Sequence, residues 1–218
     1  CHPAHATVEL ASGATSRLDA LRVGDEIRTP TGFEPVVGFL HADAKAYTSY
    51  HVLTTDGGRT IEISDNHWLM VDRVEADPAM AKVGQRLTTT EGEQTIVSIF
   101  KADRAGAYHL VTASGQYYVD GVLASTYVAY IPRSMWSVFG DGYITLRYAL
   151  GVPLVPDGQS TVPLFWFLDT MKALAIPAPL QVSVFWLPLV ASVVLSELVS
   201  ALIAHLPMTA SFLALTLV

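Results

Sequence analysis

The sequence has little cysteine, little charge and no basic run. Its 218 residues contain one cysteine, Cys1, which excludes an internal disulfide framework and the usual Cys-rich zinc sites. Charged residues make up 15% of the chain, the formal net charge is -7, and no run of Lys or Arg occurs, which argues against nucleic acid as a partner. Hydrophobic residues, by contrast, make up 51%, more than a typical soluble domain contains.

The single cysteine is the first residue, and no Met precedes it. Chain termini are rarely packed, so Cys1 is poorly suited to serve as a small buried hydrophobe. A thiolate is a strong nucleophile. We therefore expect Cys1 to attack the peptide bond that once joined it to an upstream segment. The alternative is an arbitrary trimming point that happens to be a cysteine.

The first 130 residues contain two halves with the same features in the same order, at a period of about 60 residues. In each half, short runs of β-branched and aromatic residues alternate with turns rich in Gly, Pro, Asp or Thr. The pattern predicts a mainly β, duplicated fold with pseudo-two-fold symmetry. The matching segments are 23–27 with 83–87, 36–40 with 96–100, 50–54 with 108–112, and 61–63 with 117–119.

This arrangement resembles the Hint fold that Hedgehog C-terminal autoprocessing domains share with inteins. Behind Cys1, residues 18–25 (LDALRVGD) are similar to the block that follows the cleavage-site Cys of the family. Ser64 and His67 match its Thr-x-x-His block, with Ser in place of Thr. Residues 118–127 (YVDGVLASTY) are closer to the Hedgehog version of the final block than to that of an intein. The resemblance implies a Hedgehog-like (hoglet-type) Hint domain.

Three positions depart from the family pattern. The final block has no Asn after a His, which disfavours splicing, and Thr126 stands where Hedgehog domains usually carry a second Cys. His41 stands where Hedgehog domains carry an Asp that is regarded as the base for the sterol hydroxyl. A neutral imidazole, with an ordinary pKa of about 6.5, suits that task near neutral pH better than a carboxylate. We expect His41 to be this base, with Asp43 as runner-up; the alternative is a loop histidine without a role.

The resemblance implies acyl transfer in two stages. The Cys1 thiol attacks the preceding carbonyl and forms a thioester, while His67 donates a proton to the departing amide nitrogen. Ser64 either hydrogen-bonds the scissile amide or orients the imidazole. In the second stage a hydroxyl group, deprotonated by His41, attacks the thioester and leaves with the upstream segment as its ester. The alternatives are a structural strand-end role for His67 and a plain turn role for Ser64.

Other histidines carry weaker signals. His51 and His109 occupy equivalent positions in the two repeats, which suggests a shared structural role in a strand. Cys1, His2 and His5 contain metal-ligating groups, but His-Pro-x-His at a flexible start more often binds metal adventitiously. We therefore expect no metal site. The resemblance implies a reaction without a cofactor, with a sterol as co-substrate.

The composition changes after about residue 130. Residues 151–162 are rich in turn formers and are typical of a linker, and beyond them the charged residues are Asp169, Lys172 and Glu197. The window 184–204 is long enough to span a bilayer. Pro188 and Glu197 lie inside it, however, so we expect two or three short helices in or against a membrane face.

The resulting division is a Hint autoprocessing domain over residues 1–148 and an apolar, mostly helical region over residues 149–218. In the Hedgehog family the region after the Hint body recognises sterol, and this implies a lipid-binding and membrane-docking role here. The alternative is a tail that merely anchors or wraps the core. The candidate substrate-binding residues are Phe165, Trp166, Phe185 and Trp186.

The main interpretation is an autoprocessing sterol acyltransferase that acts once on its own precursor. Its expected partners are the upstream N-terminal segment of that precursor, a sterol or other lipid alcohol, and a membrane surface. The family implies a location in the secretory pathway, at the endoplasmic reticulum. Two alternatives remain: a self-cleaving protease that ends in hydrolysis or thiolysis, and a non-catalytic, membrane-binding Hint relic.

Overall fold

The computed structural model describes residues 1–65, 67–128, 141–149, 151, 154–155, 195 and 199. The chain divides into two units, Cys1–Val162 and Pro163–Val218. The four aromatic candidates for sterol binding lie outside the described residues. The expected short helices do so too, except that Leu195 and Val199 are described and are helical. Among the helices that the structure describes, none is long and apolar enough to cross a membrane.

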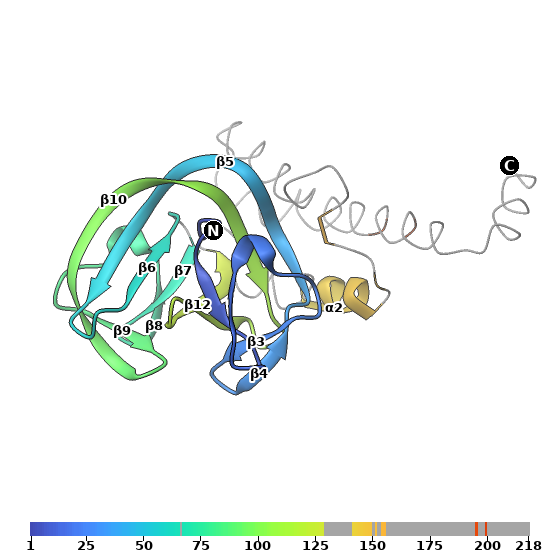
Figure 1. Ribbon diagram of the computed structural model, residues 1–218, viewed down its shortest axis with the longest axis horizontal. Helices are drawn as coiled ribbons and strands as arrows, with labels where there is room; N and C mark the ends of the chain where they lie inside the picture. Colours follow the sequence, from blue (N-terminus) through green and yellow to red (C-terminus); the bar gives the residue numbers. More distant parts are fainter. Residues whose placement is uncertain are drawn as a thin grey trace, which may run out of the picture. The chain divides into compact units, whose positions relative to one another are not determined.

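The described part of the first unit is mainly β, as predicted (Figure 1). Its many short strands reflect the runs of β-branched and aromatic residues separated by turn formers. In chain order the elements are β1 (Thr7–Glu9), β2 (Thr15–Arg17), the 3-10 turn η1 (Leu18–Ala20), β3 (Glu26–Thr29), β4 (Gly32–Pro35), β5 (Gly38–Thr55), β6 (Thr60–Ile63), β7 (His67–Val71), β8 (Val74–Ala76), the 3-10 turn η2 (Pro78–Met80), β9 (Arg86–Thr89), β10 (Gly92–Val111), β11 (Gln116–Val119), β12 (Val122–Val128) and α2 (Asp141–Ala149).

The predicted duplication is visible in the backbone. The Gly24 N–H donates to the Val36 carbonyl at 2.8 Å, and the Gly84 N–H donates to the Ile96 carbonyl at 2.9 Å. The two glycines have φ angles of 95° and 94°, in the region that side chains disfavour, so both turns need glycine. The same turn therefore opens each half and leads into a strand of the same length, β3 or β9.

The two halves are joined by the long antiparallel pair β5 and β10, which forms a curved arch over the β body in Figure 1. Their pairing runs from Ile96 opposite Thr55 to Val111 opposite Gly38. Both ends of β5 are largely buried, whereas its middle is mostly exposed, because each end packs into a different half. Residues distant in sequence, such as His41 and His109, thereby become cross-strand neighbours.

A hydrophobic core shared by both repeats supports this arch. Each buried aliphatic side chain contributes about 1.5–3 kcal/mol relative to an exposed one. The fully buried members include Leu53, Ile61, Leu69, Leu87, Ile96 and Leu110.

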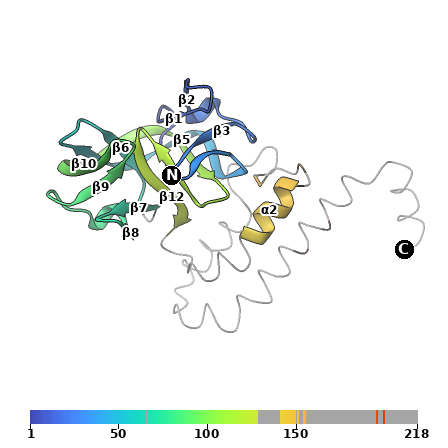
Figure 2. The ribbon, with the colours of Figure 1, turned by 90° about the horizontal axis from the view of Figure 1, so that it is seen from below.

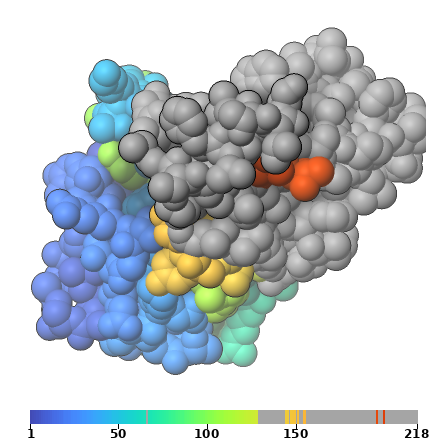
Figure 3. All heavy atoms as spheres, turned by 90° about the vertical axis from the view of Figure 1, so that its right-hand side faces the viewer, coloured from blue at the N-terminus to red at the C-terminus, as the bar shows by residue number. Residues whose placement is uncertain are grey.

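The segment after the β body returns to the start of β5. Leu154 lies so close to Gly38 that a Cβ atom added there would come within 2.3 Å of Leu154 Cδ1. Figure 3 shows the yellow atoms of α2 beside the blue atoms of the N-terminal half. Glycine at position 38 therefore makes room for the chain that follows α2.

Candidate active site

The first residues of the chain are held at the centre of the β body, where Figure 2 marks the N-terminus among β3, β5 and β12. The Ser64 N–H donates to the Cys1 carbonyl at 2.9 Å. His2 and Tyr108 exchange two backbone hydrogen bonds of 2.7 and 2.9 Å, so the start of the chain extends the edge of β10. These bonds fix the Cys1 backbone between the end of β6 and β10.

The same segment passes close to a glycine in β10. Gly106 has a φ angle of 82°, and an added Cβ atom would lie 2.9 Å from the Ala4 backbone nitrogen. The Ala4 N–H donates to the Ala105 carbonyl at 3.0 Å. Glycine is required here both for the backbone angle and for the close approach of the first residues.

The Cys1 nitrogen contacts two side chains. It donates to Ser64 Oγ at 2.6 Å and lies 2.6 Å from His67 Nδ1. His67 Nε2 lies 2.7 Å from the Ser125 carbonyl oxygen, which only accepts hydrogen bonds, so we assign the ring proton to Nε2. Nδ1 therefore presents its lone pair to the Cys1 nitrogen.

The Cys1 sulfur contacts a different histidine. His41 Nδ1 lies 3.2 Å from Sγ, within the range of an S–H···N hydrogen bond. The Asp43 carboxylate instead accepts hydrogen bonds from the Lys45 and Ala46 backbone nitrogens at 2.8 and 3.2 Å and stabilises a bend in β5. Of the two predicted candidates for the base, the structure brings His41 to the sulfur.

A third histidine, His109, completes the surroundings of His67. Its ring is fully buried, with a centroid 4.3 Å from that of His67, and its Nε2 lies 2.7 Å from the Thr126 carbonyl oxygen. His51, its counterpart in the other repeat, instead hydrogen-bonds the Asp65 carboxylate. Both histidines are buried in strands, as predicted, but their hydrogen-bond partners differ. The position of His109 beside His67 follows from the strand register that places His109 opposite His41. No local sequence pattern predicts that register.

His2 and His5 do not gather around Cys1 as metal ligands. His2 Nδ1 donates to the Glu62 carbonyl at 2.9 Å, and the His2 ring lies 4.9 Å from that of His67. His5 Nε2 lies 3.1 Å from the Glu62 carboxylate. Within the described ranges, no three His, Cys, Asp or Glu side chains form a group that could hold a metal ion.

Burial dominates the electrostatics of this site. It lowers the pKa of His67 well below the ordinary value, and the adjacent Cys1 amino group, His109 and His2 lower it further. Burial likewise lowers the pKa of His109 well below its ordinary value and that of His2 to about 3. The pKa of His41 is lowered by burial first and by the Cys1 amino group second. Neutral imidazoles therefore face both the nitrogen and the sulfur of Cys1 near neutral pH.

This arrangement provides a nucleophile and two proton-transfer groups. A thiol lies against one neutral imidazole, and the nitrogen on the same residue lies against another. Such a pair can accept a proton from sulfur and, once His67 Nδ1 has taken up a proton, supply one to nitrogen. The four residues predicted as catalytic, Cys1, Ser64, His67 and His41, are thus brought together.

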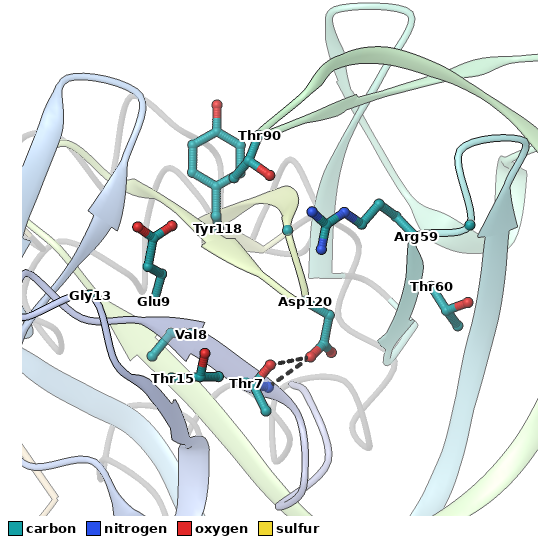
Figure 4. Close-up of a pocket in the computed structure, with 12 residues that line it drawn as sticks. Thr7, Val8, Glu9, Gly13, Thr15, Arg59, Thr60, Thr90, Tyr118 and Asp120 are labelled. Atoms are coloured by element: carbon teal, nitrogen blue, oxygen red, sulfur yellow. Dashed lines mark hydrogen bonds between the residues drawn. The ribbon is translucent and has the colours of Figure 1, made fainter.

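A separate cavity of about 470 Å³ contains none of these four residues (Figure 4). Asp120 lies at its edge, in a two-residue turn with Gly121 in which both residues have positive φ angles of 51° and 79°. The Asp120 carboxylate accepts hydrogen bonds from the Thr7 N–H at 2.9 Å and from the Thr7 hydroxyl at 2.7 Å. These bonds tie β1 to the hairpin between β11 and β12, and they give Asp120 a structural role.

Comparison with known proteins places this geometry in a family. The Hint module family matches residues 1–140. The solved structure of the gp41-1 intein has a TM-score of 0.50 and 20% identity to this chain, covering 57% of this chain and 96% of the intein. The Ssp DnaB mini-intein variant M86 has a TM-score of 0.50 and 14% identity, covering 58% and 93%. These two structures show that the fold is shared.

Two curated proteins are similar to this chain in sequence. Protein qua-1 from Caenorhabditis elegans is 28% identical over an alignment of 156 residues that covers 58% of this chain and 13% of that protein. Indian hedgehog protein from Gallus gallus is 28% identical over an alignment of 200 residues that covers 72% of this chain and 48% of that protein. The chain thus spans less than half the length of either relative. By its match over residues 1–140, this chain belongs to the Hint module family, and it is of the Hedgehog type.

Proposed function

We propose that this chain cuts the peptide bond before Cys1 through an internal thioester and transfers the upstream segment to a sterol hydroxyl. One observation carries the first part: the nitrogen and the sulfur of Cys1, the two atoms that exchange the acyl group, each face a separate imidazole. The Hint module and the Hedgehog-type relatives both support autoprocessing.

The first stage is an N-to-S acyl shift. The Cys1 thiol gives its proton to His41 Nδ1, and the sulfur attacks the carbonyl carbon that precedes Cys1. His67 Nδ1 takes up a proton from solvent and passes it to the amide nitrogen as the C–N bond breaks. His41 returns the thiol proton to solvent, so both imidazoles are neutral again when the second stage begins. Because burial depresses the pKa of His67, its imidazolium form is a strong proton donor once it has formed. Ser64 Oγ accepts a hydrogen bond from the same nitrogen and orients the scissile amide.

The second stage transfers the acyl group to an alcohol. The hydroxyl proton passes to His41 Nδ1, the alkoxide oxygen attacks the thioester carbonyl, and the C–S bond breaks. The upstream segment leaves as an ester, and the Cys1 sulfur recovers a proton from His41. His41 fits this role because it lies 3.2 Å from the sulfur that carries the acyl group. The acyl group and the protons come from the chain and the alcohol, so neither stage needs a cofactor.

A membrane sterol is the proposed nucleophile, delivered by the apolar region 149–218. The low charge of residues 163–218 supports contact with a lipid surface. Phe165, Trp166, Phe185 and Trp186 are the proposed contacts with the sterol rings. The Hedgehog-type relatives support action within the secretory pathway. The proposed place within that pathway is the membrane of the endoplasmic reticulum.

The test uses the full chain preceded by a short upstream peptide, with the peptide's intact mass as readout. The precursor is incubated with lipid vesicles that contain cholesterol, cholestane (the same rings without the hydroxyl), or no sterol. We expect the released peptide to gain the mass of cholesterol less one water in the first sample only, and the His41→Ala variant to lose this product. Release as the free acid in all three samples would reject sterol transfer and favour the alternative, a self-cleaving protease.

A further inference from the structure

β12 departs from regular pairing where it passes the two buried histidines, His67 and His109. Against β7, Ala124 pairs with Leu69 and Val128 pairs with His67. β12 advances four positions (124 to 128) between these pairs, whereas β7 covers two (67 to 69). Residues 125–127 of β12 therefore bulge away from the regular ladder with β7.

Two consecutive carbonyl groups of this bulge accept hydrogen bonds from imidazoles. His67 Nε2 lies 2.7 Å from the Ser125 oxygen, and His109 Nε2 lies 2.7 Å from the Thr126 oxygen. The two rings lie against each other with centroids 4.3 Å apart and planes inclined by 37°. Each ring therefore presents an N–H group to the bulge, and the bulge in turn fixes the orientation of each ring.

Packing alone does not account for a histidine at position 109. Its side chain is 1% exposed and lies against the His67 ring, and burying an imidazole is costly unless it is hydrogen-bonded. A Leu or Phe side chain would fill the space without that cost, but it would leave the buried Thr126 carbonyl without this donor. The imidazole at this position thus serves the carbonyl.

We infer that His109 is a positioning residue for the acyl shift: by donating to the Thr126 carbonyl it holds the β12 bulge, and the bulge holds His67 with Nδ1 toward the Cys1 nitrogen. The kinetic test of this inference rests on the proposed function, because it measures cleavage through the thioester. In the described structure the His109 Nε2–H donates to the Thr126 carbonyl, and the His109 ring lies against that of His67. Its effect is exerted through the Ser125 carbonyl and through the ring of His67.

The kinetic experiment compares His109→Phe, which keeps a ring but has no donor, with His109→Gln, which keeps an N–H donor but has no ring. Each variant is made in the full chain with the short upstream peptide, and dithiothreitol is added to release the peptide from the thioester. His51→Phe is the matched control, because it makes the same change at the equivalent position of the other repeat. Circular dichroism selects folded samples.

We expect His109→Phe to lower the dithiothreitol-dependent cleavage rate at least tenfold and more than His51→Phe does. We expect His109→Gln to recover at least half of the wild-type rate. A wild-type rate for His109→Phe, or equal losses for the Phe and Gln variants, would overturn the inference. A wild-type precursor that does not cleave would instead reject the proposed function.

A second measurement does not depend on activity. The nitrogen chemical shifts of ¹⁵N-labelled histidine report which nitrogen of His67 carries the proton. In the folded chain with His109 present, we expect the proton on Nε2, where it bonds the Ser125 carbonyl. We expect a mixture of the two tautomers in His109→Phe and a return to the Nε2 form in His109→Gln. An unchanged Nε2 form in His109→Phe would overturn the positioning role.

Discussion

Acidification should destabilise this fold through its three fully buried imidazoles. His2, His67 and His109 are each at most 1% exposed and have lowered pKa values, in all three cases chiefly because of burial. In the unfolded chain each imidazole has an ordinary pKa of about 6.5. Below that pH the unfolded chain binds protons that the folded chain does not, so the free energy of unfolding falls as the pH falls.

The size of this loss follows from proton linkage. Between pH 7.5 and 5.5, one histidine that stays neutral in the fold reduces the free energy of unfolding by about 1.3 kcal/mol, and three reduce it by about 4 kcal/mol. The free energy of unfolding of a domain is typically about 5–15 kcal/mol. A loss of this size therefore removes a large part of it at pH 5.5.

The assay is urea unfolding at pH 7.5 and 5.5, followed by tryptophan fluorescence and circular dichroism. A Cys1→Ala precursor with a short upstream peptide is used, because the account predicts that it stays intact and its residue 1 nitrogen is an amide that does not titrate. As a control, His2→Phe should reduce the loss by about one third. A loss below about 1 kcal/mol would refute the reasoning, since it would mean that the buried rings take up protons in the fold.

Two substitutions test how the nitrogen and the first residues of the chain are held. Ser64→Ala should slow thioester formation about tenfold, because the Cys1 nitrogen loses its hydroxyl acceptor, whereas Ser64→Thr should retain most of the rate; equal rates for both would refute this role. Gly106→Ala should lower the free energy of unfolding by about 1–3 kcal/mol and slow cleavage, because it strains a positive φ angle and displaces Ala4; urea unfolding at wild-type values would contradict this.

Much of the fold was predictable from the sequence, for an identifiable reason. Turns such as those at Gly24 and Gly84 recur, each after a valine and before a short strand, so a repeat of short strands could be recognised locally. Cys1, Ser64 and His67 were predictable because their spacing matches that of a known block, and His41 because it could be counted from the same block.

The remaining contacts depend on long-range register. His109 lies beside His67 only because β10 pairs with β5 in one particular register and because β12 bulges at residues 125–127. Neither feature leaves a local pattern, since a shift of one residue turns a side chain to the opposite face of a strand. The same register separates His51 from the site, although it is the repeat equivalent of His109.

The central claim is that an acyl group moves from the nitrogen to the sulfur of Cys1. The most direct measurement incubates the full chain, preceded by a short upstream peptide, with dithiothreitol and follows the intact masses over time. The account predicts release of the peptide as its dithiothreitol thioester, and no release from the Cys1→Ala precursor. Cleavage of the Cys1→Ala precursor at the wild-type rate would contradict it.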